Sequence, residues 1–283
     1  MGTVIEINKR HFGIYEFGKN NGQVVFYFHG FPGSSLDGFL FDFDSVANEL
    51  ELRIIAIDRP GIGNSDFQTN RKLIDWINDV SSIADYLGID TFSVLGLSGG
   101  APYALVTAFG LPKRIVSTTV VSGMGPMNYN ESNIGTAMLI PKMHHFLRRI
   151  IVWFMKKGIE NNPEKFQRKI VSSLPDCDIK YLTNSSKVEN ILTLFREAFK
   201  QGLKGFLHEA KIYHDPWGFD IKEVKSEVFL WHGSFDKNVD IQLAKRMALE
   251  LPNCKSRFIE KEGHFSLAGK YLKEILTEIK EKF

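Results

Sequence analysis

Short apolar runs, each about as long as a buried strand, alternate with longer amphipathic segments over the first 124 residues. These runs predict strands at Thr3–Ile7, Gly13–Phe17, Gln23–Phe28, Arg53–Ile57, Phe92–Leu97 and Ile115–Val121. Between them, helices are expected over 38–50, 71–87 and 101–110. Asn70 is the expected N-cap of the helix over 71–87, and Gly88 its expected end. Strands that alternate with helices predict an α/β fold with a mostly parallel, doubly wound sheet.

This alternation stops in the middle of the chain and resumes near its end. Residues 125–215 contain no convincing strand, and helices are expected there over 139–157, 163–173, 177–183 and 187–213. The alternation resumes with a strand at Val228–Trp231, a helix over 241–250, a strand at Arg257–Ile259 and a terminal helix over 265–282. We therefore expect a core in two parts, 1–124 and 216–283, with an all-helical lid inserted at 125–215.

One serine lies between an apolar strand and a helix, in the sequence Gly96-Leu97-Ser98-Gly99-Gly100. The spacing G-x-S-x-G is weak as a pattern, because an ordinary glycine–serine turn can match it by chance. Its place after Phe92–Leu97 and before a helix is the one that a nucleophile elbow requires. There the glycines relieve crowding, so that a strained serine stands exposed at the edge of the sheet. Ser98 is the candidate nucleophile.

A serine hydroxyl is a poor nucleophile near neutral pH and needs a base that a third group orients. Among the 8 histidines, His264 directly follows the last predicted strand and precedes the last helix. Loops at the carboxyl ends of parallel strands open onto one edge of the sheet, so His264 is able to reach Ser98. His232, in a setting that indicates packing, is the closest rival.

The acid that orients the base is expected after another strand end. Asp236 follows Val228–Trp231, whereas the loop after Ile115–Val121 offers no carboxylate. Asp240 is a second candidate, but its position favours capping of the helix that begins at Ile241.

An acyl-transfer site also needs fixed donors for the developing oxyanion. The backbone N–H of Gly99, directly after Ser98, is one candidate. The second is expected in the loop His29-Gly30-Phe31-Pro32-Gly33, where Pro32 has no N–H and Phe31 is the natural donor.

Together, the elbow at Gly96–Gly100, the loop His29–Gly33, the loop Asp58–Ser65, Asp236 and Gly263-His264 resemble the α/β-hydrolase fold family. The resemblance covers most of 20–124 and 215–283 and is weak over the helical block. It implies an α/β-hydrolase sheet with a helical lid and the catalytic residues in the chain order serine, aspartate, histidine. In that family the loop Asp58–Ser65 is chiefly structural, and its arginine either pairs with a carboxylate or is solvated. A serine nucleophile disfavours the dehalogenase and epoxide-hydrolase branches, which use aspartate.

Composition limits the partners and the compartment. The formal net charge of +2 is too small to indicate a nucleic-acid partner. The 2 cysteines, Cys177 and Cys254, have no spacing typical of metal ligands, and we expect neither a metal nor a disulfide framework. No signal peptide is visible, and the longest strongly apolar run, Ile150–Met155, is too short for a membrane span. We expect a cytoplasmic protein without integral membrane association.

The segment 143–157 mixes aromatic and aliphatic residues with arginines and lysines. One interpretation is a surface helix that meets anionic lipid or an acyl chain. The other, which we favour because apolar periodicity usually reflects packing, is a lid helix that roofs a pocket and has solvated lysines. Under that interpretation the pocket accepts a hydrophobic acyl or alkyl group.

These residues predict a serine hydrolase that cleaves a carboxylic ester or related acyl compound and needs no cofactor. Ser98 attacks, His264 acts first as base and then as acid, and Asp236 orients the imidazole; water then releases the acyl-enzyme. C–C bond hydrolysis, acyl transfer to another acceptor and cofactor-free peroxidation stay open on the same scaffold. A non-catalytic ligand receptor is a further alternative, which the complete triad disfavours.

Overall fold

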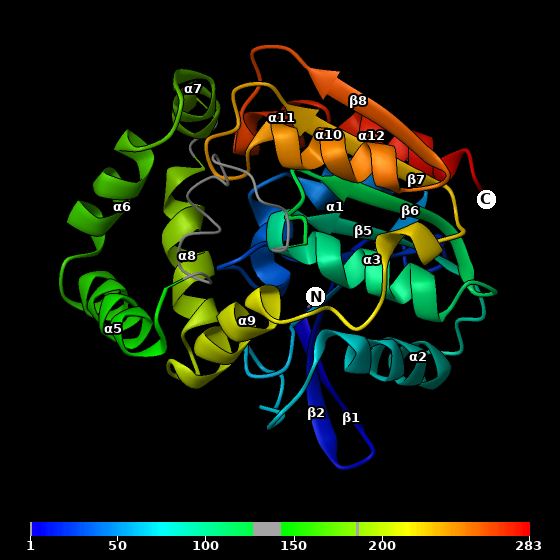
Figure 1. Ribbon diagram of the computed structural model, residues 1–283, viewed down its shortest axis with the longest axis horizontal. Helices are drawn as coiled ribbons and strands as arrows, with labels where there is room; N and C mark the ends of the chain where they lie inside the picture. The colour runs from blue at the N-terminus through cyan, green and yellow to red at the C-terminus, as the bar shows by residue number, and fades with distance from the viewer. Residues whose placement is uncertain (1, 127–142, 185–186) are drawn as a thin grey trace.

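A mostly parallel sheet of eight strands runs through the centre of the molecule (Figure 1). The computed structural model describes residues 2–126, 143–184 and 187–283. The strands lie in the order β1-β2-β4-β3-β5-β6-β7-β8; in the described sheet β2 runs antiparallel to its neighbours β1 and β4, and the other adjacent pairs are parallel. Their bounds are β1 Gly2–Ile7, β2 Arg10–Gly18, β3 Gln23–Phe28, β4 Leu52–Ile57, β5 Phe92–Leu97, β6 Ile115–Val121, β7 Val228–Gly233 and β8 Cys254–Ile259. The predicted α/β fold is confirmed.

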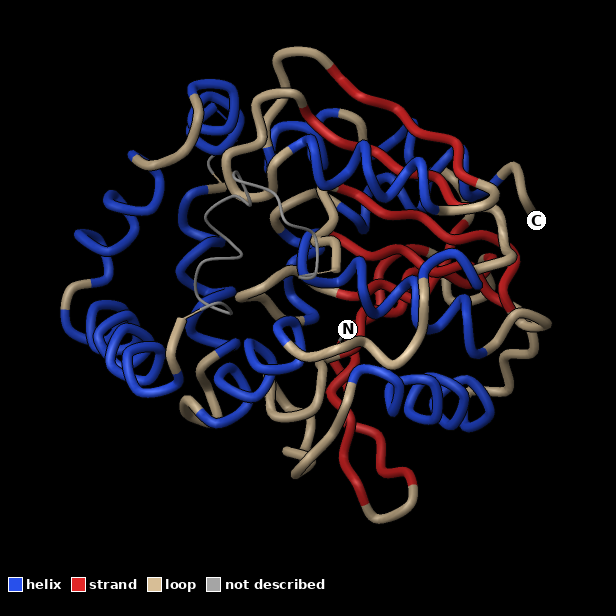
Figure 2. The backbone as a smooth tube through the Cα atoms, viewed as in Figure 1, coloured by secondary structure: helices blue, strands red, loops and turns tan. Residues whose placement is uncertain are grey.

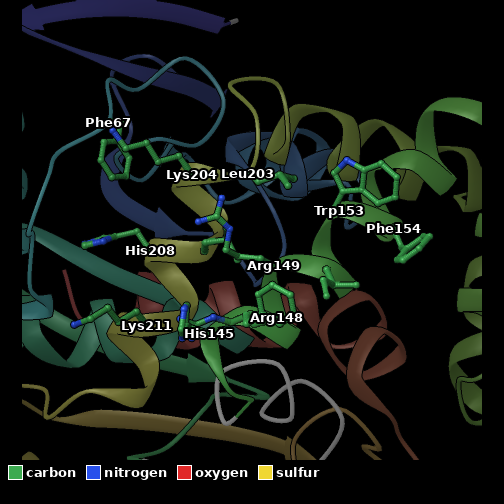
Figure 3. Close-up of a pocket in the computed structure, with 13 residues that line it drawn as sticks. Phe67, His145, Arg148, Arg149, Trp153, Phe154, Leu203, Lys204, His208 and Lys211 are labelled. Carbon is green, nitrogen blue, oxygen red and sulfur yellow. The ribbon is translucent and has the colours of Figure 1, made fainter.

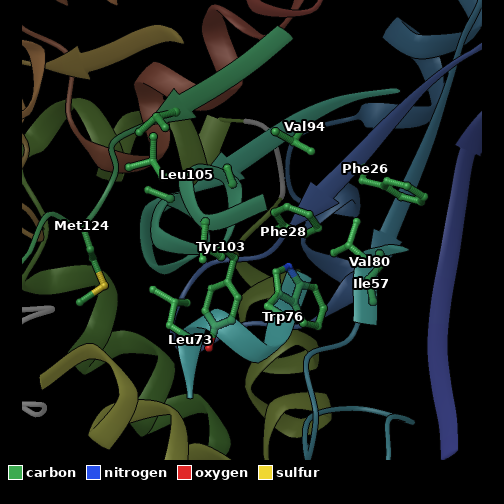
Figure 4. Packing of buried hydrophobic residues seen from close by; sticks show 14 of the residues in the cluster. Phe26, Phe28, Ile57, Leu73, Trp76, Val80, Val94, Tyr103, Leu105 and Met124 are labelled. Carbon is green, nitrogen blue, oxygen red and sulfur yellow. The ribbon is translucent and has the colours of Figure 1, made fainter. Parts of the chain in front are cut away.

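Helices cover both faces of this sheet, and alternate side chains of each strand pack against them. Val25 and Tyr27 of β3 pack on the face that carries α1 (Phe43–Glu49) and α12 (Leu272–Lys280). Phe26 and Phe28 point the other way, toward α2 (Trp76–Tyr86), α3 (Ala101–Gly110) and α10 (Ile241–Glu250), as Figure 4 shows for Trp76 and Tyr103. Because both faces are covered, the central strands are apolar throughout and stand out in the sequence.

The edge strand β8 was harder to predict. It begins at Cys254, three residues before the predicted start at Arg257, and its residues Lys255, Ser256 and Arg257 are exposed. An exposed edge strand needs no continuous apolar run, so its first residues carry no hydrophobic signal.

The start of the helix predicted over 71–87 was wrong. Asn70 does not cap it: this residue has a φ of 56°, and a single 3-10 turn at Leu73–Asp75 precedes α2. The predicted end is confirmed, since Gly88 has a φ of +65° directly after the helix.

Three other predicted helices are each divided into two in the structure. The sequence predicted single helices there because helical periodicity continues across the breaks. The helix expected over 38–50 is a 3-10 turn at Ser35–Phe39 followed by α1, with Asp42 at a φ of 60° between them. The helix expected over 187–213 is α8 (Val188–Ala198) and α9 (Lys204–His214), with Gly202 at a φ of +92° between them. The terminal helix is α11 (His264–Lys270) and α12, which meet at Tyr271.

Between β6 and β7 the chain forms an inserted helical region over 145–214, at the left of Figures 1 and 2. It consists of α5 (His145–Asn161), α6 (Pro163–Ser172), α7 (Asp176–Asn184), α8 and α9. The first predicted lid helix began at residue 139, and its residues 139–142 lie outside the described part of the chain. The boundaries predicted at 125 and 215 stay predictions. In the residues that were searched, no helix has the length and apolarity needed to cross a membrane.

Candidate active site

Ser98 lies in a sharp turn between β5 and α3. Its φ of 53° falls in the left-handed region, which is strained for a residue with a side chain. A Cβ on Gly96 would lie 2.5 Å from the carbonyl oxygen of Gly100, and one on Gly100 would overlap the carbonyl oxygen of Phe28. The glycines therefore allow the close backbone packing that this turn requires. Ser98 and His264 line the same cavity, which has a volume of about 230 Å³.

His264 and Asp236 are joined by a hydrogen bond of 2.7 Å between Nδ1 and Oδ2. The Asp236 side chain is fully buried, and its Oδ1 accepts the N–H groups of Asn238 and Val239 at 2.8 and 3.0 Å. These bonds fix the carboxylate in the loop after β7. Because Nδ1 donates to Asp236, Nε2 is the ring nitrogen left to accept a proton.

The charges of this pair shift each other's pKa. Burial lowers the pKa of His264, but the charge and hydrogen bond of Asp236 outweigh it and raise the pKa above the ordinary 6.5. Burial raises the pKa of Asp236, but His264 outweighs it and lowers that pKa below its ordinary value. The pair thus favours an imidazolium next to a carboxylate, the arrangement that a general base produces when it takes a proton.

The rival residues have other roles in the structure. His232 is fully buried, is bonded through Nε2 to the carbonyl of Val239 at 2.9 Å and does not line the cavity. Asp240 is the N-cap of α10 and accepts the N–H of Gln242 at 2.8 Å, as expected.

The loop after β3 lies directly against the elbow, so the two candidate oxyanion donors are neighbours. A Cβ on Gly99 would lie 3.1 Å from the backbone nitrogen of Phe31. The loop is held from two sides: Asp37 accepts the N–H of Gly30 at 2.8 Å, and Arg59 donates to the carbonyls of His29 and Gly30. These contacts fix the backbone that carries the N–H of Phe31.

Arg59 pairs with a carboxylate, which settles the alternative left open by the sequence. Its Nε donates to Glu209 of α9 at 2.8 Å, and both side chains are buried. Glu209 also accepts from the hydroxyl of Tyr103 and lies 3.5 Å from Nη2 of Arg71. Burial raises the pKa of Glu209, but the two arginines outweigh it and lower the pKa to about 2. The inserted helical region therefore neutralises the arginine that holds the oxyanion loop.

Asp178 of α7 is a residue that sequence reasoning missed. Its Oδ2 accepts the N–H of His264 at 2.9 Å, and its Oδ1 accepts those of Phe265 and Ser266 at 3.0 and 2.8 Å. Asp178 is fully buried, and a Cβ on Gly263 would lie 2.5 Å from its carboxylate oxygens. A signal was available: the N-cap of α11 is Gly263, which has no side-chain acceptor, so the buried start of that helix needs an acceptor from elsewhere.

The walls of the cavity are mostly apolar and come from the core and from the inserted helices. The inserted region contributes Met155, Ile170, Ser173, Leu174, Ile191, Leu194 and Phe195. Among its described lining residues there is no lysine or arginine, and the one carboxylate, Asp37, is bonded to the N–H groups of Gly30 and Ser34. A search of the described residues finds no cluster of three or more side chains suited to hold a metal ion.

This fold, with a serine elbow and a paired histidine at one edge of the sheet, defines the class of α/β hydrolases. The chain belongs to the alpha/beta hydrolase fold family, whose model matches residues 23–271. A putative proline iminopeptidase of Mycoplasma genitalium is 27% identical over 245 residues, 77% of each chain. A 2-hydroxy-6-oxononadienedioate/2-hydroxy-6-oxononatrienedioate hydrolase of Paraburkholderia phymatum is 22% identical over 83% of this chain and 78% of its own.

Solved structures agree on the fold. A thermophilic esterase from Thermogutta terrifontis superposes with a TM-score of 0.71 at 16% identity, over 98% of this chain and 97% of its own. Such a likeness shows the fold alone. The names of these proteins describe different activities, so membership of the family defines a hydrolase scaffold and leaves its substrate open.

Proposed function

We propose that the protein is a serine hydrolase that cleaves carboxylic esters with apolar acyl groups. The observation that carries the proposal is the shared cavity: Ser98 and the Asp236-bound His264 face one space with apolar walls. A cytoplasmic location remains a prediction.

In the proposed reaction, Ser98 Oγ attacks the ester carbonyl carbon while Nε2 of His264 takes its proton. The N–H groups of Gly99 and Phe31 bind the resulting oxyanion. The imidazolium then protonates the leaving alcohol, and water, activated by the same nitrogen, releases the acid from Ser98. Asp236 stabilises the imidazolium throughout, in agreement with the raised pKa of His264.

The chemistry of the lining favours an uncharged acyl group over the substrates of the other relatives. A substrate with a protonated amine, such as an N-terminal residue, needs a free carboxylate, and Asp37 is already bonded to backbone N–H groups. A dicarboxylate needs cations, and the described lining contains none. An apolar acyl chain fits both facts, because burying it against leucines and phenylalanines is favourable.

The test combines covalent labelling with turnover. Wild type, Ser98→Ala and Ser122→Ala are treated with a fluorophosphonate and with p-nitrophenyl esters of increasing acyl length. Ser122 is a matched control, since it is a second buried serine with positive φ at a strand end and does not line the cavity. We expect Ser98→Ala alone to lose labelling and turnover, and the rate in wild type to rise with acyl length until the cavity is filled.

Labelling and hydrolysis that survive in Ser98→Ala would contradict the proposed nucleophile. Faster turnover of N-terminal amino acid p-nitroanilides than of any ester would instead favour a peptidase. Labelling without turnover of any of these esters would contradict ester specificity while leaving Ser98 as the nucleophile.

A further inference from the structure

Helix α5 carries its largest apolar side chains on its exposed side. Phe146, Trp153 and Phe154 are 63%, 48% and 62% exposed, and Leu147 and Ile150 are also exposed. The buried residues of the helix are Arg148, Val152 and Ile159. The favoured interpretation of this segment, an apolar side that roofs a pocket, holds for Met155, which lines the cavity of Ser98. It does not hold for the aromatic residues. Contiguous exposed apolar side chains of this size mark an interaction surface.

Phe146, Ile150, Trp153 and Phe154 line an open groove of about 810 Å³ between α5, α9 and Phe67 (Figure 3). Of the 13 described residues that line it, four are arginine or lysine, and none is aspartate or glutamate. The four are Arg148, Arg149, Lys204 and Lys211. The net charge of the whole chain is only +2, so this groove is a local concentration of positive charge.

The cations of the groove are only partly neutralised by neighbouring residues. Arg148 is 9% exposed, and its Nε has no hydrogen-bond partner among the described residues. Its electrostatic partner is Asp215, which already forms an ion pair with Lys211. Lys204 lies 4.2 Å from the centre of the Phe67 ring. A partly buried guanidinium whose Nε has no acceptor is suited to bind a further anion, since buried charges are normally paired.

We propose that α5 and the groove together dock the protein on an anionic phospholipid bilayer, with lipid phosphates at the four cations of the groove and its aromatic side chains in the membrane interface. Helices that lie in a membrane interface typically combine exposed Trp and Phe side chains with arginines and lysines. Because Met155 of the same helix lines the acyl cavity, docking brings that cavity to the bilayer surface. The substrates implied are lipid esters, and this part of the inference rests on the proposed function.

Trp153 provides a specific probe of docking. The other three tryptophans, Trp76, Trp217 and Trp231, are buried, so a change in the polarity around an exposed indole reports on Trp153. Fluorescence and flotation are measured with vesicles of phosphatidylcholine alone and with added phosphatidylglycerol. A third arm uses a short-chain phosphatidylglycerol below its micelle concentration. We expect a blue shift and co-flotation with the anionic vesicles only, weakened by salt.

Two variants test the two parts of the surface. Phe146→Ala/Phe154→Ala should weaken vesicle binding at least about tenfold, because it removes two interfacial aromatic side chains. Arg149→Glu should weaken binding at least about fivefold, since one cation near an anionic surface contributes about that factor. Tyr86→Ala and Lys245→Glu, exposed positions on α2 and α10, are the matched controls and should bind as wild type does.

The outcomes separate docking from catalysis. Equal binding to neutral and anionic vesicles, no binding to either, or equally tight binding of the monomeric lipid would overturn the docking proposal. Hydrolysis of a water-soluble ester should be unchanged in both variants, because their side chains do not line the cavity. Anionic vesicle binding without any ester turnover would support docking and refute the proposed reaction. Ester turnover without vesicle binding would do the reverse.

Discussion

Removal of the Asp178 carboxylate should impair catalysis by His264, the candidate base, although the His264 side chain itself is not changed. Asp178 accepts three N–H groups at the start of α11, the first of which belongs to His264. In Asp178→Ala these donors lose their acceptor in a buried place, where each unsatisfied group costs about 1–3 kcal/mol. Allowing for relaxation and water entry, we expect a loss of about 3 kcal/mol in the free energy of unfolding. For a chain of this length that corresponds to a fall in Tm of roughly 6 °C.

The effect on catalysis should exceed a general loss of stability. A shift of about 1 Å in His264 can reduce the rate by about a hundredfold, because proton transfer depends on geometry. We expect kcat and kcat/KM of Asp178→Ala to fall together by between ten- and a hundredfold, with KM little changed, since the base acts in the transition state. Asp176→Ala is the control: Asp176 lies in the same first turn of α7 but is exposed, and it should behave as wild type.

A second variant separates positioning from folding. Asp178→Asn keeps one oxygen acceptor but removes a negative charge that helps to raise the pKa of His264. The acid limb of the kcat/KM profile should therefore move to lower pH, a change that a purely structural role does not produce. The assay is kcat/KM for a soluble ester between about pH 5 and 9, with Tm from thermal unfolding. Wild-type kcat and Tm in Asp178→Ala would refute this reasoning.

Three further predictions concern the other contacts of the site. In wild type, kcat/KM should fall as pH falls through the raised pKa of His264, because the base must be neutral; in Asp236→Asn, where the charge of Asp236 no longer offsets burial, the acid limb should move to lower pH at much reduced activity. Arg59→Met should lower the free energy of unfolding in urea by about 3–5 kcal/mol, because it leaves Glu209 buried without its main partner; wild-type stability would contradict that role. Gly100→Ala should abolish fluorophosphonate labelling or soluble expression, since its Cβ overlaps the Phe28 carbonyl; a fully labelled variant would show that the elbow can relax.

The sequence by itself determined the parts of this protein that depend on local sterics and on burial. The central strands are apolar on both faces, so β3 and β5 were predicted with their observed bounds. The elbow was predicted because the glycines around Ser98 relieve a steric clash that depends only on the local sequence. His264 and Asp236 followed from the rule that strand ends share one edge, and the structure brings these two side chains together.

Only the tertiary structure decided which distant groups meet and which face of a helix is covered. The bond from His264 to Asp178 joins residues 86 positions apart, and the pair of Arg59 and Glu209 joins residues 150 apart. Such contacts leave no periodic pattern in the sequence, because they form only when the inserted helices pack on the core. Helix α5 shows the same limit. Periodicity identifies an apolar side, but burial is a property of the whole fold, and here much of that side faces outward.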